Sequence, residues 1–509
     1  MPDPWWKSAV VYQIYPRSFA DANGDGVGDL KGIRRHLDHL AWLGVDAIWL
    51  SPFYRSPMAD FGYDVADYCD VDPLFGTLED FDRLVTDAHE RDLKVLVDWV
   101  PNHSSDRHAW FEEARASRDS AKRDWYIWVD GTPDTPPNNW RAAFSQVDPA
   151  WTWDEPTGQW YLHLFLPEQP DLNWRNPAVV DAMHDTLRFW LDRGVDGFRM
   201  DVVHALVKAE GFPDVDDPWL STDRLDEPAV HDLIRGFRRL LDSYPGDRTS
   251  VGEVFILSTA KVAEYYGQSD ELHMAFNFPP LYAKWDAAVW RKRVDRVVEE
   301  LDARNAWPTW VLSNHDNPRH AGRYGSEARA RAAAVLLLTL RGTPFLYQGE
   351  ELGLTDAVIP PERVVDPGGR DGTRAPIPWT SAPDHGWGST EPWLPWPPHA
   401  ERRNAESEGA DPSSVLHLYK RLLAARHASP ALRLGAWSPL PSPEGVLAYG
   451  RTLDHDRRAV LVNFTEAPVD APVADDWMVE VASDGHGEGD PYDGTLGPDQ
   501  ALVLRPPTS

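Results

Sequence analysis

The sequence predicts an α/β fold: a (β/α)8 TIM barrel with an inserted small domain after strand 3 and a C-terminal antiparallel β-sandwich domain. Three observations carry this prediction. Eight short apolar runs alternate with stretches of helical periodicity, one long irregular segment follows the third run, and the end of the chain changes to short alternating runs.

The eight apolar runs are the predicted barrel strands. They cover residues 9–15, 46–51, 94–100, 195–201, 250–254, 272–278, 309–316 and 343–348. Helical periodicity fills most of the gaps, over residues 30–43, 78–91, 178–192, 283–301 and 326–340. Strands joined through helices lie parallel in one sheet, and eight of them close into a barrel.

Two segments are additions to the barrel. Residues 102–177 are rich in Trp, Pro and Asp and are too long for a loop between a strand and a helix. After a predicted helix at 413–427, runs such as 445–451 and 458–463 have the alternation of antiparallel strands. The predicted domains are a barrel domain made of residues 1–102 and 177–430, the inserted domain at 103–176 and the C-terminal β-domain at 431–509.

Composition narrows the classes of function. The chain has 509 residues, 42% of them hydrophobic, and 25 Trp, which argues against disorder and for a large buried core. A formal net charge of -31 repels phosphate backbones and anionic lipid, so we expect neither nucleic acid nor a membrane surface as a partner. Neutral or cationic small ligands fit better.

The sequence also predicts a cytoplasmic protein. Cys69 is the only cysteine, so no intramolecular disulfide can form. The N-terminus lacks the basic and apolar regions of a signal peptide. The longest apolar run, 332–340, is about half of what spans a bilayer and ends at Arg341, so no transmembrane segment is predicted.

Charged side chains gather where the predicted strands end. Arg199 and Asp201 are two residues apart in a strand and therefore share a face, which should keep Asp201 ionised. Taken alone, this is as well explained by a structural ion pair. However, Glu253 ends the fifth strand and Asp316 ends the seventh, so all three carboxylates should converge on one mouth of the barrel.

Such a cluster of like charges costs folding energy and therefore implies a use. Retaining glycoside hydrolysis needs one carboxylate as nucleophile and one carboxylic acid as proton donor. A third carboxylate, with His103 and His315, can hold the sugar hydroxyls. Metal binding is the alternative, but these residues lack a local ligand spacing such as HExxH.

With these residues in place, the chain resembles the α-amylase superfamily, glycoside hydrolase family 13, and within it the oligo-1,6-glucosidase and α-glucosidase branch. The matching segments are 62–64 (GYD), 98–103 (DWVPNH), 169–173 (QPDLN), 197–201 (GFRMD), 252–254 (GEV), 314–316 (NHD), 342–344 (GTP) and 349–350 (GE). They occur in order along nearly the whole chain. The resemblance implies that Asp201 is the nucleophile, Glu253 the acid/base and Asp316 the transition-state stabiliser.

The resemblance also implies a set of substrate-binding residues. These are Tyr63, Asp64, His103, Phe165, Arg199, His204, His315 and Arg374. In the segment 370–376 (RDGTRAP), we expect Arg374 to pair with Asp64 across the sugar site, because an arginine holds such a pair in exo-acting members. The pair would bind a terminal glucose and block longer chains. The alternative is that Arg374 ties down a surface loop.

One loop has the oxygen spacing of a calcium site. Its candidate ligands are Asp21, Asn23, Asp25, the Val27 carbonyl and Asp29. Gly26 is at position 6, as in an EF-hand loop, but position 12 is Gly32 where an EF-hand has glutamate. Similar loops in the family hold a structural Ca²⁺, although glycine-rich turns alone would also explain the stretch. No organic cofactor is predicted.

The predicted activity is an exo-acting retaining α-glucosidase that acts on short oligosaccharides. The alternative is a transglucosylase or a sucrose/trehalose-type isomerase with the same carboxylates; isomerisation is disfavoured because the RLDR segment of sucrose isomerases is absent after Phe278. A non-catalytic relative would have lost catalytic carboxylates. Val202 matches the residue of α-1,6-specific members, whereas His204 and segment 273–278 do not, so the linkage preference stays open. The sequence does not indicate the oligomeric state.

Overall fold

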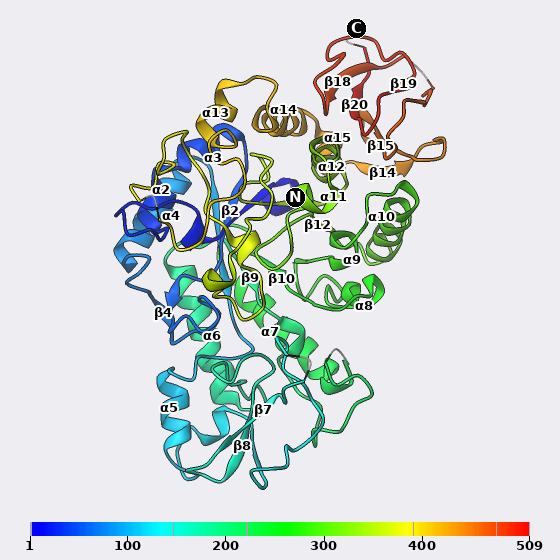
Figure 1. Cartoon of the computed structure of the whole chain (residues 1–509). Coiled ribbons are helices and arrows are strands. Elements are labelled where there is room, and N and C mark those ends of the chain that lie inside the picture. The colour runs from blue at the N-terminus through cyan, green and yellow to red at the C-terminus, as the bar shows by residue number, and fades with distance from the viewer. Residues whose placement is uncertain (1–2, 146, 220–221, 390, 475, 508–509) are drawn as a thin grey trace.

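The core of the molecule is one sheet of eight parallel strands (Figure 1). The computed structural model describes residues 3–145, 147–219, 222–389, 391–474 and 476–507. In sheet order the strands are β11 (Met274–Ala275), β10 (Thr249–Gly252), β9 (Gly197–Met200), β5 (Lys94–Trp99), β2 (Ala47–Leu50), β1 (Val11–Ile14), β13 (Thr343–Tyr347) and β12 (Thr309–Val311). All eight predicted strands are present.

The two edge strands nearly close the sheet into a barrel. The Thr309 hydroxyl on β12 donates to the Ala275 carbonyl of β11 at 2.8 Å. The Tyr266 hydroxyl reaches the same carbonyl at 3.4 Å and that of Trp307 at 3.1 Å. Side chains therefore bridge the seam, and the predicted TIM barrel is confirmed.

Helices cover the outside of the barrel. They are α1 (Trp5–Ser8), α2 (Leu30–Arg35), α3 (Leu37–Leu43), α4 (Leu78–His89), α6 (Pro177–Asp192), α7 (Glu227–Asp242), α8 (Thr259–Glu264), α9 (Phe278–Leu281), α10 (Ala287–Asp302), α11 (His320–Tyr324) and α12 (Glu327–Thr339). Their starts follow from sequence: Thr77 and Asp80 form a capping box at α4, and Asn176 caps α6 ahead of a proline.

The helix predicted over 30–43 is two helices. His36 has non-helical backbone angles (φ -107°, ψ 8°), and its amide bonds to the carbonyls of Ile33 and Arg34. Its ring stacks on Trp379 with 3.6 Å between ring centroids. A tertiary contact therefore interrupts a pattern that reads as continuous in the sequence.

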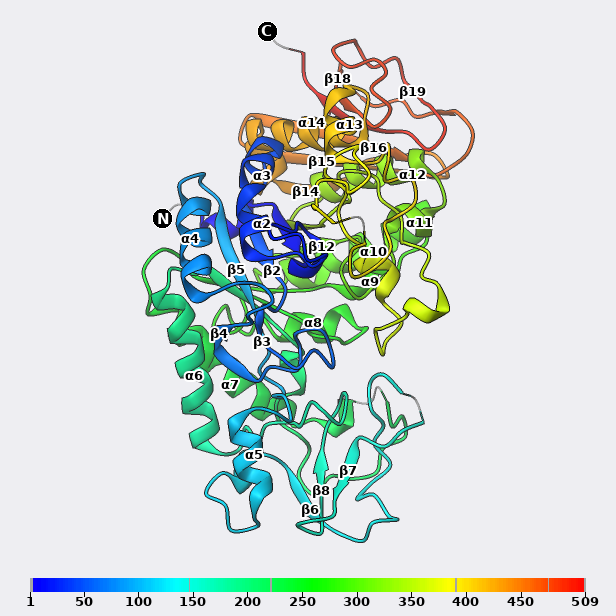
Figure 2. The same cartoon turned by 60° about the vertical axis from the view of Figure 1, so that its left-hand side comes forward.

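The predicted inserted domain lies between β5 and β9 and forms a lobe at one end of the molecule (Figure 2). It contains α5 (Ala109–Ala116) and an antiparallel sheet of β6 (Trp128–Asp130), β8 (Gln159–Leu162) and β7 (Trp151–Asp154). A second short pair, β3 (Tyr54–Arg55) with β4 (Asp67–Val71), frames the loop that follows β2.

The C-terminal antiparallel strands lie at the opposite end (Figures 1 and 2). The larger sheet has β14 (Ala436–Pro439), β15 (Val446–Leu453), β16 (Asp456–Asn463), β20 (Ala501–Arg505) and β18 (Met478–Ala482), and a small one pairs β17 (Val469–Asp470) with β19 (Thr495–Leu496). The helices α13 (Ala405–Ala410), α14 (Val415–Ala428) and α15 (Pro430–Leu434) connect these strands to the barrel.

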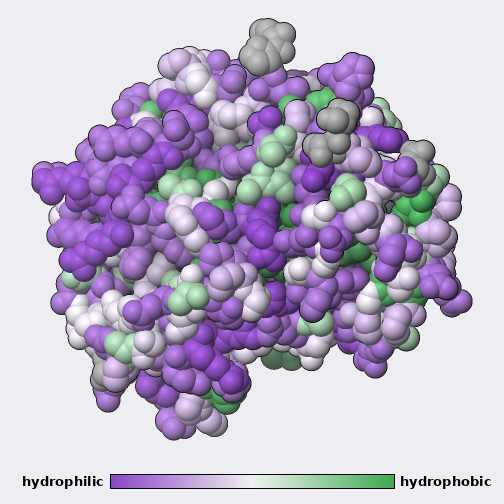
Figure 3. Space-filling model, turned by 90° about the horizontal axis from the view of Figure 1, so that it is seen from above, coloured by the Kyte–Doolittle hydropathy of each residue, from purple (hydrophilic) through white to green (hydrophobic). Residues whose placement is uncertain are grey.

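The face seen from the C-terminal end is mostly hydrophilic, with small separate hydrophobic patches (Figure 3). Within the stretch of chain that the structure describes, no helix combines the length and the apolar character that crossing a bilayer requires.

Candidate active site

The three predicted catalytic carboxylates meet at one mouth of the barrel. Asp201 directly follows β9, Glu253 directly follows β10, and Asp316 comes from the loop after β12. All three line one cavity of about 460 Å³. Of the predicted substrate-binding residues, the cavity is lined by Tyr63, His103, Phe165 and His204.

Arg199 contacts two of these carboxylates, those of Asp201 and Glu253. Its side chain is 3% exposed, and its Nη1 lies 2.5 Å from Asp201 Oδ1 and 2.8 Å from Asp98 Oδ1. Its Nη2 binds Glu253 Oε2. Asp98 stands opposite Arg199 in the register of β5 and β9, so the strand pairing itself creates this contact. One guanidinium therefore serves three carboxylates.

Arg199 lowers the pKa of Asp201, in the predicted direction, but other causes outweigh it. Burial raises the pKa of Asp201 well above its usual range, and the neighbouring Glu253 and Asp98 add to the rise despite Arg199. Asp98 behaves in the same way, since burial raises its pKa to about 7. The single cation of Arg199 therefore does not offset the burial of Asp201 or of Asp98.

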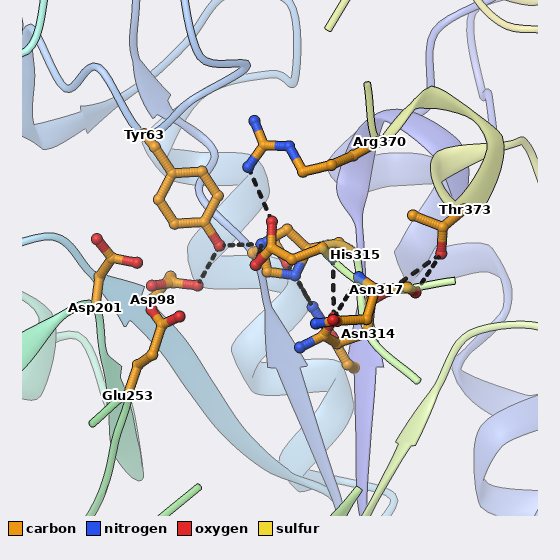
Figure 4. A network of polar contacts seen from close by, with 12 residues as sticks. Tyr63, Asp98, Asp201, Glu253, Asn314, His315, Asn317, Arg370 and Thr373 are labelled. Atoms are coloured by element: carbon orange, nitrogen blue, oxygen red, sulfur yellow. Dashed lines mark hydrogen bonds and ion pairs between the residues drawn. The ribbon is translucent and has the colours of Figure 1, made fainter. Parts of the chain in front are cut away.

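Tyr63, which lines the cavity, and His315 belong to one network of polar contacts (Figure 4). The Tyr63 hydroxyl lies 2.6 Å from His315 Nε2 and donates to Asp98 Oδ2 at 3.1 Å. The Gln13 amide nitrogen is 2.7 Å from His315 Nδ1. Burial lowers the pKa of His315 to about 3, so the ring is neutral. With Nδ1 accepting from Gln13, Nε2 carries the proton and donates to Tyr63.

The pKa of Asp316 is shifted in the opposite direction to that of Asp201. Its Oδ1 lies 2.9 Å from Arg370 Nη1 and 3.3 Å from Arg374 Nη2. Burial alone would raise the pKa of Asp316, but His315, Arg370 and Arg374 outweigh it and hold the pKa well below its usual range. Asp316 is therefore the carboxylate that stays ionised.

The charged clamp across the site is formed by residues other than the predicted pair. Arg370 Nη2 lies 2.6 Å from Asp60 Oδ1, and both residues line the cavity (Arg370 is shown in Figure 4). Arg374 is fully buried behind them, on Asp366, Asp316 and the His315 carbonyl. The expectation of an Asp64–Arg374 pair is corrected to Asp60–Arg370.

The backbone of the loop after β3 explains this correction. Phe61 and Gly62 have positive φ angles of 48° and 111°, which turn the chain back on itself. Asp64 is fully buried and accepts hydrogen bonds from Ser56 Oγ and from the amides of Ala59 and Asp60. It builds the loop, and the loop presents Asp60 to the cavity.

His103 and Phe165 form another wall. His103 is 1% exposed, its Nε2 lies 3.1 Å from Gln169 Nε2, and its ring is 5.1 Å from that of Phe165. Gln169 in turn donates to Asp60 Oδ2 at 3.1 Å. His204 Nδ1 is 3.3 Å from the Glu253 carbonyl oxygen, at the start of the loop after β10.

Four polar residues of this network were not predicted from the sequence as site residues: Asp60, Asp98, Gln169 and Arg370. Each had a signal, because Asp98, Gln169 and Arg370 begin segments 98–103, 169–173 and 370–376, and Asp60 stands just before 62–64. The aromatic wall residues Phe144, Trp219, Phe255, Phe278 and Tyr282 also line the cavity. They had no comparable signal.

The predicted calcium loop has suitable donor atoms but a different arrangement. All candidate ligands are oxygens, as Ca²⁺ prefers. However, Asp21 accepts from the amides of Asn23, Gly24 and Gly26. Among the residues that the structure describes, no group of three His, Cys, Asp or Glu side chains could hold a metal ion. Calcium binding stays a prediction, and no chemical step depends on it.

Comparison with known proteins decides the family. Residues 13–435 match the alpha amylase catalytic domain. The chain belongs to the alpha-amylase family. A probable alpha-glucosidase of Rhizobium meliloti is 43% identical over 91% of this chain and 90% of its own. An oligo-1,6-glucosidase of Parageobacillus thermoglucosidasius is 38% identical over 91% of each. The predicted family is thus confirmed, and this member is a glycoside hydrolase-type enzyme.

Solved structures that resemble this chain have a wider range of named activities than the glucosidases above. An alpha-glucosyl transfer enzyme superposes with a TM-score of 0.90 at 41% identity, covering 99% of this chain and all of its own. The trehalulose synthase of Pseudomonas mesoacidophila superposes with a TM-score of 0.92 at 36% identity and the same coverage. Proteins similar to this chain are thus named as glucosidases, as a glucosyl transfer enzyme and as a trehalulose synthase.

Proposed function

We propose that this enzyme is an exo-acting retaining α-glucosidase that releases glucose from the non-reducing end of short α-glucosides. The observation that carries the proposal is the Asp60–Arg370 ion pair at 2.6 Å across the cavity that holds Asp201, Glu253 and Asp316. A pair joined across the sugar site binds the far side of a terminal glucose and leaves no path for a longer chain.

In the first step, Glu253 protonates the glycosidic oxygen while Asp201 attacks the anomeric carbon. The bond to the leaving group breaks, and a glucosyl ester of Asp201 forms. Because both carboxylates bind adjacent nitrogens of Arg199, the guanidinium can follow the charge as it moves from Asp201 to Glu253. Ionised Asp316 stabilises the positive charge that develops on the sugar ring.

In the second step, Glu253 accepts a proton from water, and the water oxygen attacks the anomeric carbon from the face that the leaving group left. Asp201 departs as carboxylate, and the product keeps the α configuration. Asp201 must be ionised to attack, and among its neighbours Arg199 favours that form, because the guanidinium lowers the pKa of Asp201.

A pair of variants tests this assignment. Asp201→Asn should lower turnover on every glucoside by several orders of magnitude, because an amide cannot form the ester. Glu253→Gln should nearly abolish hydrolysis of maltose but spare much of the hydrolysis of an aryl glucoside whose leaving group needs no proton. Early product should be the α anomer by NMR. More than a tenth of wild-type activity in Asp201→Asn would contradict the nucleophile.

Glucosyl transfer is the second candidate, favoured by the TM-score of 0.90 to an alpha-glucosyl transfer enzyme. It shares the first step and differs only in what attacks the ester. The ratio of free glucose to transfer product from maltose, isomaltose and sucrose separates the two activities and gives the linkage preference. A product mixture dominated by isomerised sucrose would instead place the enzyme with the trehalulose synthases.

A further inference from the structure

Asp366 is a buried acid that lies behind the charged clamp, on the long loop between β13 and α13. Its side chain is 0% exposed, and the described residues that line the cavity do not include it. Asp60 and Arg370, which form the clamp, do line the cavity. A sugar in the cavity therefore does not reach Asp366, so any effect of this residue on the reaction must pass through its neighbours.

Asp366 holds the guanidinium of Arg370 along one edge. Its Oδ2 accepts from Arg370 Nε at 2.9 Å and its Oδ1 from Arg370 Nη2 at 2.7 Å. Two parallel bonds of this kind fix the plane of a guanidinium as well as its position. The backbone amide of Arg370 donates to the same carboxylate at 2.7 Å. With this edge occupied, Nη1 faces Asp316 at 2.9 Å, and Nη2 also reaches Asp60 at 2.6 Å.

The carboxylate of Asp366 also reaches the second arginine beside Asp316. Asp366 Oδ1 accepts from Arg374 Nη1 at 3.1 Å, and Arg374 Nη2 lies 3.3 Å from Asp316 Oδ1. Burial alone would raise the pKa of Asp366, but Arg370 and Arg374 outweigh it and hold the pKa below its usual range. One ionised carboxylate therefore anchors both of the arginines that contact Asp316.

The backbone of the loop is shaped around Asp366. Asp371 Oδ2 accepts from the amides of Val365 at 2.8 Å and of Asp366 at 3.1 Å, which fixes the main chain there. Gly368 packs directly on the ion pair: a Cβ at this position would lie 2.9 Å from Arg370 Nε and 3.2 Å from Asp366 Oδ2. A side chain at position 368 would therefore push the two charged groups out of place.

We propose that Asp366 is a positioning residue, which fixes Arg370 and Arg374 in the orientation that the sugar site requires. Through Arg370 it closes the clamp on Asp60, and through both arginines it aligns Asp316. The inference rests on the proposed function, which gives the clamp and Asp316 their roles. Without Asp366, Arg370 loses the two bonds that fix its plane, so the clamp loosens and holds the sugar less well.

The kinetics of Asp366→Asn on maltose, isomaltose and an aryl α-glucoside test the proposal. Asparagine has the same shape, but one acceptor oxygen becomes an NH₂ donor that faces the donors of Arg370. On every substrate that the wild type hydrolyses, we expect KM to rise at least about fivefold and kcat/KM to fall about tenfold or more. A smaller folded fraction would lower kcat and leave KM unchanged, so the rise in KM distinguishes positioning from a structural role.

The outcomes separate this inference from the proposed function. Wild-type KM and kcat in Asp366→Asn, with glucose still released by the wild type, would overturn the positioning role alone. Absence of glucose from all three substrates with the wild type would overturn the proposed function, and this role with it.

A double-mutant cycle shows whether Asp366 acts through Arg370. In the Arg370→Ala background, Asp366→Asn should cost at most about threefold in kcat/KM, because the main group that Asp366 positions has gone. The remaining loss reflects its contact with Arg374. An equal fold loss in the wild-type and Arg370→Ala backgrounds would overturn the proposal.

Asp196→Asn is the matched control for loss of a buried ion pair. Asp196 is 2% exposed and lies 2.9 Å from Arg248 Nη1 and 2.7 Å from His89 Nε2. It directly precedes β9, at the end of the strand opposite Asp201. Asp196→Asn should lower the thermal midpoint but leave KM unchanged. A rise in KM as large as that in Asp366→Asn would show a general effect of stability and overturn the proposal.

Gly368→Ala tests the same contact without changing any charge. The added methyl group separates Arg370 Nε from Asp366 Oδ2, so KM should rise here too, by about threefold or more. This variant keeps the proposal testable even where Asp366→Asn folds poorly. A wild-type KM in Gly368→Ala, with the thermal midpoint also unchanged, would show that the alignment of the pair does not matter and would overturn the proposal.

Discussion

Asp201 and Asp316 face the same cavity from opposite sides, and their pKa values are shifted in opposite directions. Asp201 shares the single guanidinium of Arg199 with Asp98 and Glu253. Asp316 contacts two guanidinium groups, those of Arg370 and Arg374. Both carboxylates are close to barrel strands in sequence, so the strand ends alone do not distinguish them.

The comparison shows that the groups in contact with each carboxylate set the direction in which its pKa shifts. Around Asp316, His315 and two arginines together outweigh the effect of burial on the pKa. Around Asp201, one arginine divided among three carboxylates does not. This suits the proposed roles: a stabiliser must hold its charge throughout, whereas a nucleophile and an acid must exchange charge during the reaction.

Replacement of Arg199 should have the largest effect, because this residue contacts Asp98, Asp201 and Glu253. Arg199→Ala would leave Asp98, Asp201 and Glu253 buried without a cation, costing about 3 to 5 kcal/mol of stability and several orders of magnitude in kcat. Arg199→Lys keeps the charge but cannot contact all three groups, so it should fold better than Arg199→Ala yet remain poorly active. Thermal unfolding and kcat on maltose measure the two effects. Near-normal kcat in Arg199→Lys would show that the shared contacts are dispensable.

Truncating Arg370 tests the other side of the site. Arg370→Ala removes a contact to both Asp60 and Asp316, so kcat/KM should fall about 10- to 150-fold, or about 1.5 to 3 kcal/mol, for every glucoside whatever its linkage. Arg363→Ala, on the same loop but exposed, is the matched control. The wild type should release only glucose from starch. Early release of maltose or longer fragments would show an open cleft and contradict the clamp.

The two pKa shifts predict opposite dependences of stability on pH. The lowered pKa of Asp316 means that its ionised form adds stability above the unfolded value of about 3.9, and that this is lost as pH falls through the folded pKa. The raised pKa of Asp201 has the other sign: its contribution is complete below about 3.9 and is lost as pH rises through the folded pKa.

The corresponding measurement is the thermal midpoint of Asp201→Asn and Asp316→Asn from pH 4 to pH 8. Relative to wild type, Asp201→Asn should become more stabilising as pH rises over the range, because the folded protein no longer has to ionise a buried carboxyl group with a raised pKa. Asp316→Asn should remain destabilising throughout. Parallel curves for the two variants would contradict the difference in charge.

The loop with Asp21, Asp25 and Asp29 provides the smallest expected effect. Its carboxylates are compensated by backbone amides in place of arginines. Calcium binding would raise the thermal midpoint by about 2 to 4 °C over that in a chelator, by mass action on the folded state. Asp25→Ala should remove this difference. If the wild type shows no difference, the calcium prediction is wrong.

Much of the architecture was predictable because it depends on local patterns. Eight short apolar runs predicted the barrel strands, and the acidic residues at the ends of the fourth, fifth and seventh runs predicted the carboxylates at its mouth. The break at His36 was not predictable, since it depends on a ring contact with Trp379 far along the chain. The clamp was predicted in the correct segments but with Asp64 and Arg374 in place of Asp60 and Arg370.

The sequence by itself determined that Asp201, Glu253 and Asp316 reach the mouth of the barrel, because the position of a strand's end is a local property. Only the tertiary structure decided which charges meet there. Positive φ angles at Phe61 and Gly62 separate Asp60, which lines the cavity, from Asp64, which is bonded within its own loop. The register of β5 on β9 places Asp98 against Arg199. Charge states depend on burial and on contacts between distant segments, and those exist only once the barrel has closed.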